Sequence, residues 1–158
     1  SLAESGHLDL SLNSVDLAAE IQGVVDFVGE SLAKAGQHPV LDLQIQQANC
    51  DPTRIRQALL ALLENARKYA APGSIRIQAR MDDGVYRVSV SDEGPGISDA
   101  FAPHVFTAFR RAPEARGSGS GLGLAVVAAI AKAHGGRATC GTASQGGTVF
   151  ELSWPETD

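Results

Sequence analysis

Asp92-Glu93-Gly94-Pro95-Gly96 is the stretch that decides this fold, together with Gly117-Ser118-Gly119-Ser120-Gly121-Leu122-Gly123-Leu124 further along the chain. In the second stretch glycine stands at every second position, immediately before an apolar run with helical spacing. Glycines leave backbone amides uncovered, and the amino-terminal end of a helix carries a partial positive charge. The two stretches therefore predict a cradle for phosphate, although either one alone is also compatible with a plain loop.

Length and composition are those of one globular domain. The chain has 158 residues, of which 44% are hydrophobic, and a formal net charge of −5. This charge argues against a general nucleic-acid or anionic-membrane surface. Three arginines nevertheless fall in one short segment, at Arg110, Arg111 and Arg116, and this local basic patch suits a small anion.

The two cysteines, Cys50 and Cys140, lie far apart without the spacing of metal ligands, so we interpret them as ordinary reduced residues of a cytosolic compartment. No apolar run approaches the roughly 18 residues of a membrane span, and the sequence does not open with a basic and then apolar leader. We expect a cytoplasmic domain, in a parent protein whose membrane anchor would lie outside this sequence.

Hydrophobic periodicity and turn residues predict helices and antiparallel strands in mixed order. The expected fold class is α+β: a two-layer α/β sandwich whose mixed, largely antiparallel sheet is covered on one face by helices. The predicted helices run from a cap at 13–16 to about 36, from Asp51-Pro52 to about Ala70, and from Leu122 to about His134; the predicted strands lie near 41–45, 75–79, 85–90, 137–142 and 148–154.

Four motifs follow one another along the chain: Asn65 with Lys68-Tyr69, then Asp92-x-Gly94-x-Gly96, then Phe106-x-x-Phe109, then Gly119-x-Gly121-x-Gly123. In this order they resemble the ATP-binding catalytic domain of bacterial sensor histidine kinases. Those domains belong to the GHKL superfamily, which also contains DNA gyrase B, MutL and a heat-shock chaperone. The resemblance covers about residues 14 to 155 and implies a Bergerat-type fold with ATP and Mg²⁺ as cofactors.

Ala61, Asn65, Lys68 and Tyr69 are spaced to share one face of a helix. An asparagine amide oxygen is a hard ligand suited to Mg²⁺, and the resemblance assigns the metal to Asn65. Lys68 would then neutralise phosphate, and Tyr69 would lie against the adenine or ribose. The alternative is a solvated helix surface.

Asp92 follows a predicted strand, so its carboxylate is a fixed acceptor at a strand end. Such an acceptor can bind the exocyclic amine of adenine, and the resemblance implies that this aspartate sets the preference for adenine. Gly94 and Gly96 would let the backbone approach the base closely. The alternative is a plain surface turn, and Glu93 is interpreted as a solvated neighbour.

Phe106 and Phe109 point the same way on a short helix, and packing in the core is the main role that we expect for them. In the family they anchor a lid over the nucleotide, here about 103 to 120, and Arg111 matches a family arginine. The resemblance also assigns nucleotide contacts to Gly119, Gly121, Leu122 and Gly123.

Two departures from the family pattern are informative. GHKL ATPases of the gyrase type carry a catalytic glutamate at the position of Ala61, and alanine cannot deprotonate water. We therefore expect ATP binding with poor hydrolysis and assign no catalytic residue with certainty. None of His7, His38, His104 or His134 has the acidic and proline context of a phosphoacceptor.

The resemblance therefore implies a catalytic domain at 13–158, preceded at 1–12 by a linker or the end of a dimerisation-domain helix. Its partners would be the phosphoacceptor domain of the same kinase and, through the full-length kinase, a response regulator; the chain alone is expected to be a monomer. One alternative is a free-standing GHKL serine kinase of the anti-sigma-factor type, which Ala61 disfavours. A module that binds only protein is disfavoured by the intact motifs.

Overall fold

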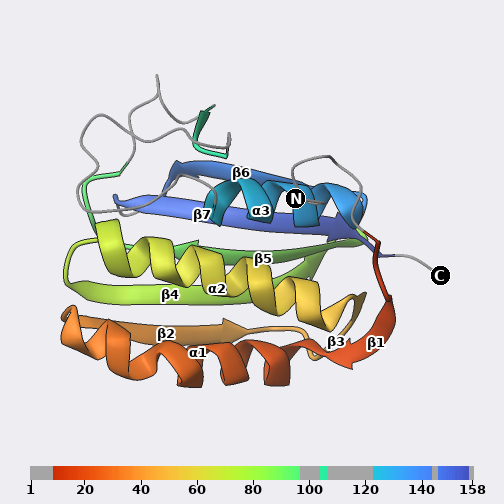
Figure 1. Cartoon of the computed structure of the whole chain (residues 1–158), viewed down its shortest axis with the longest axis horizontal. Helices are drawn as coiled ribbons and strands as arrows, with labels where there is room; N and C mark the ends of the chain where they lie inside the picture. Colours follow the sequence, from red (N-terminus) through yellow and green to blue (C-terminus); the bar gives the residue numbers. More distant parts are fainter. Residues whose placement is uncertain (1–8, 97–103, 107–122, 144–145, 157–158) are drawn as a thin grey trace.

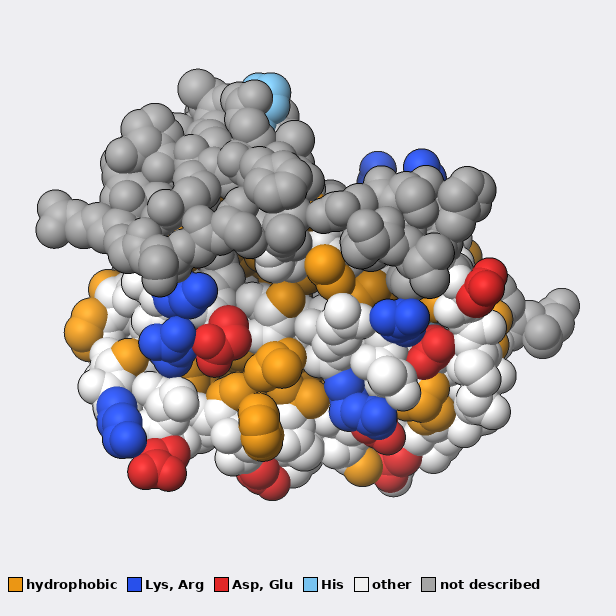
Figure 2. Space-filling model, in the orientation of Figure 1, with side chains coloured by type: hydrophobic (Ala, Val, Ile, Leu, Met, Phe, Trp, Pro, Cys, Tyr) orange, Lys and Arg blue, Asp and Glu red, His pale blue; other side chains and the backbone are white. Residues whose placement is uncertain are grey.

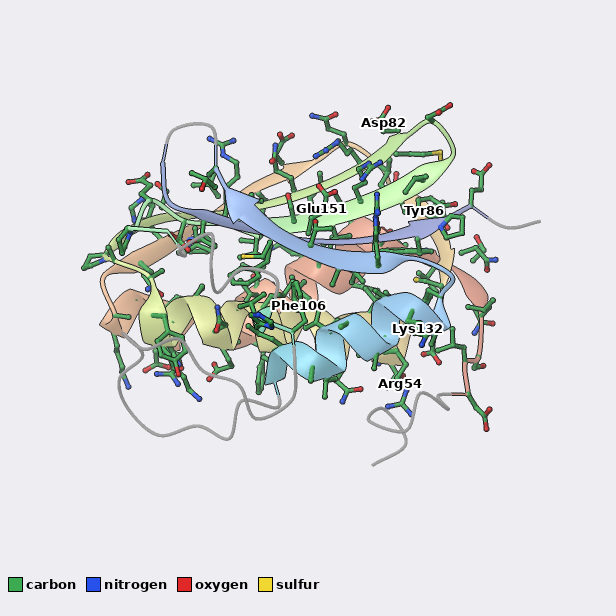
Figure 3. The ribbon with its side chains drawn as sticks, turned by 90° about the horizontal axis from the view of Figure 1, so that it is seen from above. Arg54, Asp82, Tyr86, Phe106, Lys132 and Glu151 are labelled. Carbon is green, nitrogen blue, oxygen red and sulfur yellow. The ribbon has the colours of Figure 1, made fainter. Side chains whose placement is uncertain are left out.

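Two layers, a sheet and a set of helices on one of its faces, make up the computed structural model of the chain (Figures 1 and 3). The structure describes residues 9–96, 104–106, 123–143 and 146–156. Their elements are β1 (Asn13–Asp16), α1 (Leu17–Lys34), β2 (Gln37–Leu43), β3 (Gln47–Cys50), α2 (Pro52–Tyr69), β4 (Gly73–Asp82), β5 (Val85–Ser91), α3 (Gly123–Ala133), β6 (Arg137–Thr142) and β7 (Thr148–Pro155).

The main sheet has five strands in the order β2-β4-β5-β7-β6. Only β2 and β4 run parallel; the other neighbours pair antiparallel. This mixed sheet with helices on one face confirms the predicted α+β class. A second, two-stranded sheet of β1 and β3 was not predicted from the sequence.

Helices α1 and α2 begin at aspartate caps. Asp16 accepts a hydrogen bond from the amide of Ala19, and Asp51 accepts from the amides of Thr53 and Arg54. Each cap satisfies amides that have no partner inside the helix. Residues 13–16, predicted to be a lead-in to the first helix, form β1, and only Asp16 acts as the cap.

The turn between β4 and β5 is the predicted hairpin. Its two central residues, Asp83 and Gly84, have φ values of 54° and 76°. Positive φ at both positions is typical of a type I′ turn, whose twist matches that of the flanking strands. Aspartate and glycine are among the residues that tolerate this conformation, which is why the local sequence sufficed to predict it.

The core lies between the sheet and the helices. Trp154 of β7 is 1% exposed, and its ring contacts those of Tyr86 and His134 at centroid distances of 5.4 and 5.8 Å. One stripe of each helix faces the sheet: in α1 it comprises Leu17, Ile21, Val24, Val25, Val28 and Leu32, and in α2 Ile55, Ala58, Leu59, Leu62, Leu63 and Ala66. Within the described parts of the chain, no helix has the length and hydropathy to span a membrane.

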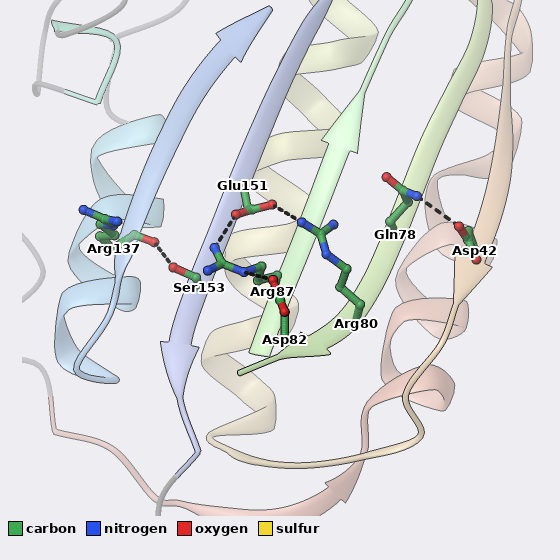
Figure 4. Close-up of polar contacts among 8 residues, drawn as sticks. All are labelled: Asp42, Gln78, Arg80, Asp82, Arg87, Arg137, Glu151 and Ser153. Atoms are coloured by element: carbon green, nitrogen blue, oxygen red, sulfur yellow. Dashed lines mark hydrogen bonds and ion pairs between the residues drawn. The ribbon is translucent and has the colours of Figure 1, made fainter. Parts of the chain in front are cut away.

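The other face of the sheet carries paired polar side chains (Figure 4). Glu151 accepts hydrogen bonds from Arg80 at 3.5 Å and from Arg87 at 2.9 Å, and Gln78 donates to Asp42 at 2.9 Å. The bond from Gln78 is the main reason that the pKa of Asp42 lies below its usual value. On the helix-bearing face, Lys and Arg side chains lie beside Asp and Glu side chains (Figure 2).

Candidate functional site

The carboxylate of Asp92 is held at the end of β5 by backbone amides. Its Oδ1 accepts hydrogen bonds from the amide of Gly94 at 2.8 Å and from that of Thr148 at 3.3 Å. The Asp92 amide in turn donates to the carbonyl of Thr148 at 2.9 Å. No donor among the described residues reaches Oδ2 of this half-exposed side chain. Asp92 is thus held in one orientation, with one oxygen that no described residue bonds.

Close backbone contacts hold the loop after Asp92. A Cβ on Gly147, whose φ is +82°, would overlap the backbone oxygen of Asp92. A Cβ on Gly96 would lie 3.3 Å from the carbonyl oxygen of Gly147, and one on Gly94 would lie 3.1 Å from Oδ1 of Asp92. These glycines permit packing within the protein; their predicted approach to a base stays a prediction.

The last turn of α2 lies beside this loop. A Cβ on Gly94 would be 3.2 Å from the amide nitrogen of Ala71, two residues after the end of the helix. In that last turn Asn65 is half-buried, whereas Lys68 and Tyr69 are exposed. The structure therefore brings two of the predicted motifs together, one on a helix end and one on a strand end.

Two polar groups on this helix end, those of Asn65 and Lys68, have no partner among the described residues. Arg67 is paired with Glu64 at 3.0 Å, whereas Lys68 makes no ion pair with the described residues. The amide of Asn65 likewise has no hydrogen bond to them. An unpaired ammonium group and a free amide oxygen on one half-exposed surface suit an anionic ligand and a hard cation.

The donor set also bears on the predicted Mg²⁺. Within the described residues, no group of three or more His, Cys, Asp or Glu side chains could hold a metal ion. Magnesium in nucleotide sites commonly keeps waters and binds one or two protein oxygens plus substrate phosphates. A single amide oxygen at Asn65 fits that mode and does not fit a metal site built from protein alone.

Phe106 lies between the sheet and the helices (Figure 3). Its ring meets that of Phe150 edge-on at a centroid distance of 6.1 Å, and its neighbour Val105 is buried. The predicted core role of Phe106 is confirmed. Helix α3 is described from Gly123, which is exposed, and its predicted start at Leu122 lies outside the described residues. Other predicted residues lie outside the described part of the chain: Phe109, Arg110, Arg111, Arg116, Gly119, Gly121 and Leu122.

His134 joins α3 to the beginning of α2. Its Nδ1 donates to the carbonyl of Ile130 at 2.8 Å, because its Nε2 accepts from the amide of Asp51 at 3.1 Å. Burial lowers the pKa of His134, so the ring is neutral. It thus caps a carbonyl of α3 as expected, although a neutral ring does not compensate the helix dipole by charge.

The cysteines are not candidates for chemistry. Burial raises the pKa of Cys50 to about 12 and that of Cys140 to about 11, so both remain thiols at neutral pH. Both are free. This agrees with their interpretation as reduced structural residues.

Sequence reasoning missed Thr148, whose amide helps to orient Asp92, and Gly147, which packs against its backbone. Thr148 is 56 positions from Asp92, and the contact depends on the pairing of β5 with β7. The sequence signalled only a glycine turn before the last strand. That turn could be connected with Asp92 only through the pairing of β5 with β7.

Comparisons with known proteins identify the family. The model of the histidine kinase-, DNA gyrase B- and HSP90-like ATPases matches residues 50–158. The chain belongs to this ATPase family. It is 42% identical, over 66% of its length, to the sensor histidine kinase component HK1 of Mycobacterium tuberculosis, of which it spans 62%.

Solved structures of the family agree with this assignment. The histidine kinase AdeS of Acinetobacter baumannii has a TM-score of 0.81 and 30% identity; the match covers 99% of this chain and 73% of that one. Full-length ShkA in complex with AMPPNP has a TM-score of 0.83 and 29% identity, over 95% of this chain and 32% of that one. These matches support the histidine kinase assignment over the anti-sigma-factor type of serine kinase.

Proposed function

We propose that this chain is the ATP-binding catalytic domain of a sensor histidine kinase. In this proposal it binds Mg·ATP and donates the γ-phosphate to a histidine on a separate dimerisation domain, for onward transfer to a response regulator. The domain would comprise residues 13–158, after a linker or helix end at 1–12, and would act on the cytoplasmic side of a membrane-anchored parent. Family membership and the similarity to ShkA, solved with AMPPNP, support it.

The observation that carries the proposal is the fixed carboxylate of Asp92 beside the last turn of α2. Oδ1 is occupied by two backbone amides, which leaves Oδ2 as an acceptor in a set position. Adenine offers an exocyclic amine to such an acceptor, whereas guanine offers a carbonyl oxygen there. Oδ2 of Asp92 therefore accepts from the adenine amine in our assignment.

In the same assignment, residues at the end of α2 bind the phosphates and Mg²⁺. Lys68 lacks an ion pair with the described residues and would neutralise phosphate, Tyr69 would cover the base or ribose, and Asn65 would hold Mg²⁺ through its amide oxygen. Bound Mg²⁺ would supply charge stabilisation of the phosphates. The resemblance adds Arg111, Gly119, Gly121, Leu122 and Gly123 as phosphate-binding groups from beyond the described residues.

The residue at position 61 sets how the bound ATP is used. Ala61 is half-buried and packs against the core, one turn before Asn65. Its methyl group cannot take a proton from water, so this position offers no general base for hydrolysis. Unless another group supplies that base, the site should hydrolyse ATP poorly and keep the γ-phosphate for another acceptor, which suits a kinase rather than a motor ATPase.

Calorimetric titration tests the proposal. The chain is titrated with ATP and with GTP, each with Mg²⁺ and with a chelator. We expect Mg²⁺-dependent binding of ATP and clearly weaker binding of GTP. Equal affinity for the two nucleotides would contradict the assignment of Asp92 to the adenine amine, and no binding of either nucleotide would contradict the proposed function.

A further inference from the structure

Helix α2 ends without the usual local cap. Its last residue is Tyr69, and the next residue, Ala70, has an extended backbone with φ −79° and ψ 152°. Many helices instead end in a left-handed glycine, whose conformation lets the following amides bond the last carbonyls. Here the amide of Ala70 bonds the carbonyl of Ala66, and the remaining carbonyls need donors from elsewhere.

Gln37 adds two donors at this helix end from another element, one to the carbonyl of Ala66, which the Ala70 amide also reaches, and one to the carbonyl of Ala70. It is the first residue of β2, it is 2% exposed, and its Nε2 donates to the carbonyls of Ala66 at 2.9 Å and Ala70 at 3.1 Å. The adjoining backbone is also paired, because the amide of Gly73 donates to the carbonyl of Gly36 at 3.0 Å. Gln37 is therefore an external cap that ties the end of α2 to the sheet, through Ala66 in its last turn and through Ala70 just past it.

This cap leaves one polar atom unsatisfied. With Nε2 on the two carbonyls, Oε1 of Gln37 is buried and has no hydrogen bond; it is the one such side-chain atom in the described parts of the chain. The reversed amide would point its oxygen at two carbonyl oxygens, which is worse. A buried acceptor without a donor destabilises a fold and offsets what the two bonds contribute, so the net contribution of this glutamine to stability is small.

We propose that Gln37 is a positioning residue for the nucleotide. It acts through the backbone of α2: by holding the last turn, it keeps Lys68 and Tyr69, the final two residues of the helix, oriented toward the ligand. Helix ends otherwise fray, and each frayed state removes both groups from the site. The inference rests on the proposed function of this site.

The first test replaces Gln37 by methionine, which has similar length and no hydrogen-bonding group of comparable strength. Gln37→Met removes both bonds to the helix end and also the unsatisfied oxygen, so the denaturation midpoint should change little. The dissociation constant for Mg·ATP should rise by up to about fivefold, because the loss of one net hydrogen bond raises the ratio of frayed to competent helix ends by about that factor and the competent fraction falls by at most as much. Amide hydrogen exchange at residues 68–70, measured without nucleotide, should accelerate.

A matched control separates positioning from stability. Ile77→Val removes one methylene from a fully buried residue of β4 and should lower the midpoint without weakening Mg·ATP binding. A second variant, Gln37→Glu, keeps the size of the side chain. At neutral pH its carboxylate would face two carbonyl oxygens and weaken binding; in acid its O–H could donate to one of them. Its affinity relative to the parent at the same pH should therefore recover as the pH falls.

The results distinguish a positioning role of Gln37 from a purely structural one. Weaker Mg·ATP binding by Gln37→Met at an unchanged midpoint, with faster exchange at 68–70, supports the positioning role. Parent-like binding by Gln37→Met overturns it, as does a loss of affinity in Ile77→Val as large as that in Gln37→Met. If Gln37→Met does not fold, the Gln37→Glu variant decides. A rise in its affinity for Mg·ATP relative to the parent as the pH falls supports the positioning role, and a relative affinity that does not change with pH overturns it. A parent that binds no nucleotide instead overturns the proposed function, and the positioning role with it.

Discussion

Asp92→Asn is the substitution that tests the geometry of the site most sharply. The amides of Gly94 and Thr148 both donate to Oδ1, and they would hold the oxygen of an asparagine amide in the same place. The NH₂ group must then occupy the position of Oδ2. A donor would replace the acceptor that we assign to adenine, while the two bonds that orient the side chain survive.

We expect ATP affinity to fall, because one hydrogen bond is lost and two donors, the asparagine NH₂ and the adenine amine, then face each other. Such a change costs about 1–3 kcal/mol, which is about 5- to 150-fold in the dissociation constant for ATP. Guanine presents a carbonyl oxygen at that position, so the ratio of GTP to ATP affinity should rise. The free energy of unfolding should stay close to that of the parent, since both backbone donors keep their acceptor.

The assay is calorimetric titration of the parent and the variant with Mg·ATP and Mg·GTP, with chemical denaturation alongside. Glu93→Gln is the matched control, because it removes the same charge from the adjacent, exposed residue and should leave both affinities unchanged. A folded Asp92→Asn variant that binds ATP as tightly as the parent would refute the assignment of this carboxylate to the base.

Three further changes have defined outcomes. Asn65→Ala should abolish the Mg²⁺-dependent part of ATP binding in calorimetry, with equal or higher thermal stability, because alanine is the better helix former. Gly147→Ala should lower the free energy of unfolding by at least about 2 kcal/mol, since its Cβ would overlap the backbone of Asp92 at a positive φ; a denaturation midpoint equal to that of the parent would contradict this. Burial lowers the pKa of His134 below 6.5 in the folded state. The neutral ring therefore contributes fully to the free energy of unfolding above pH 6.5, and this contribution is lost as the pH falls through the folded-state pKa. Urea midpoints measured from pH 7 to 5 should therefore fall, and less steeply in His134→Gln.

Local signals in the sequence were enough to predict the helices and the main strands. Asp51 and Pro52 start α2, and Asp83-Gly84 forms a hairpin turn, because these residues favour such conformations wherever they occur. The small sheet of β1 and β3 was missed. Its strands have four residues each. The residues of β1 are mostly polar, and β3 alternates only over Gln47–Cys50, with Ala48 and Cys50 buried, which is too short a run to distinguish a strand from a loop.

The contacts that orient the candidate site depend on the tertiary fold. The motif residues Asn65 and Asp92 were identified from residue type and spacing, yet some of the groups that orient Asp92 and the end of α2 come from distant strands. Thr148 reaches Asp92 through the pairing of β5 with β7, and Gln37 reaches α2 from the start of β2. A glutamine at the start of a strand has no local signature for such a role, because its partners are carbonyls at and just past the end of a helix, 29 and 33 residues away.

Transfer of labelled phosphate tests the central claim most directly. The chain is incubated with Mg²⁺ and ATP labelled in the γ-phosphate, alone and with the helical hairpin domain of its parent kinase added as a separate protein. Positioning and charge stabilisation carry phosphoryl transfer, so an acceptor added in trans should suffice, at a lower rate than a tethered one. We predict acid-labile label on a histidine of the hairpin and none on this chain. Stable label on the chain itself, or no transfer to the hairpin while ATP is bound, would contradict the account.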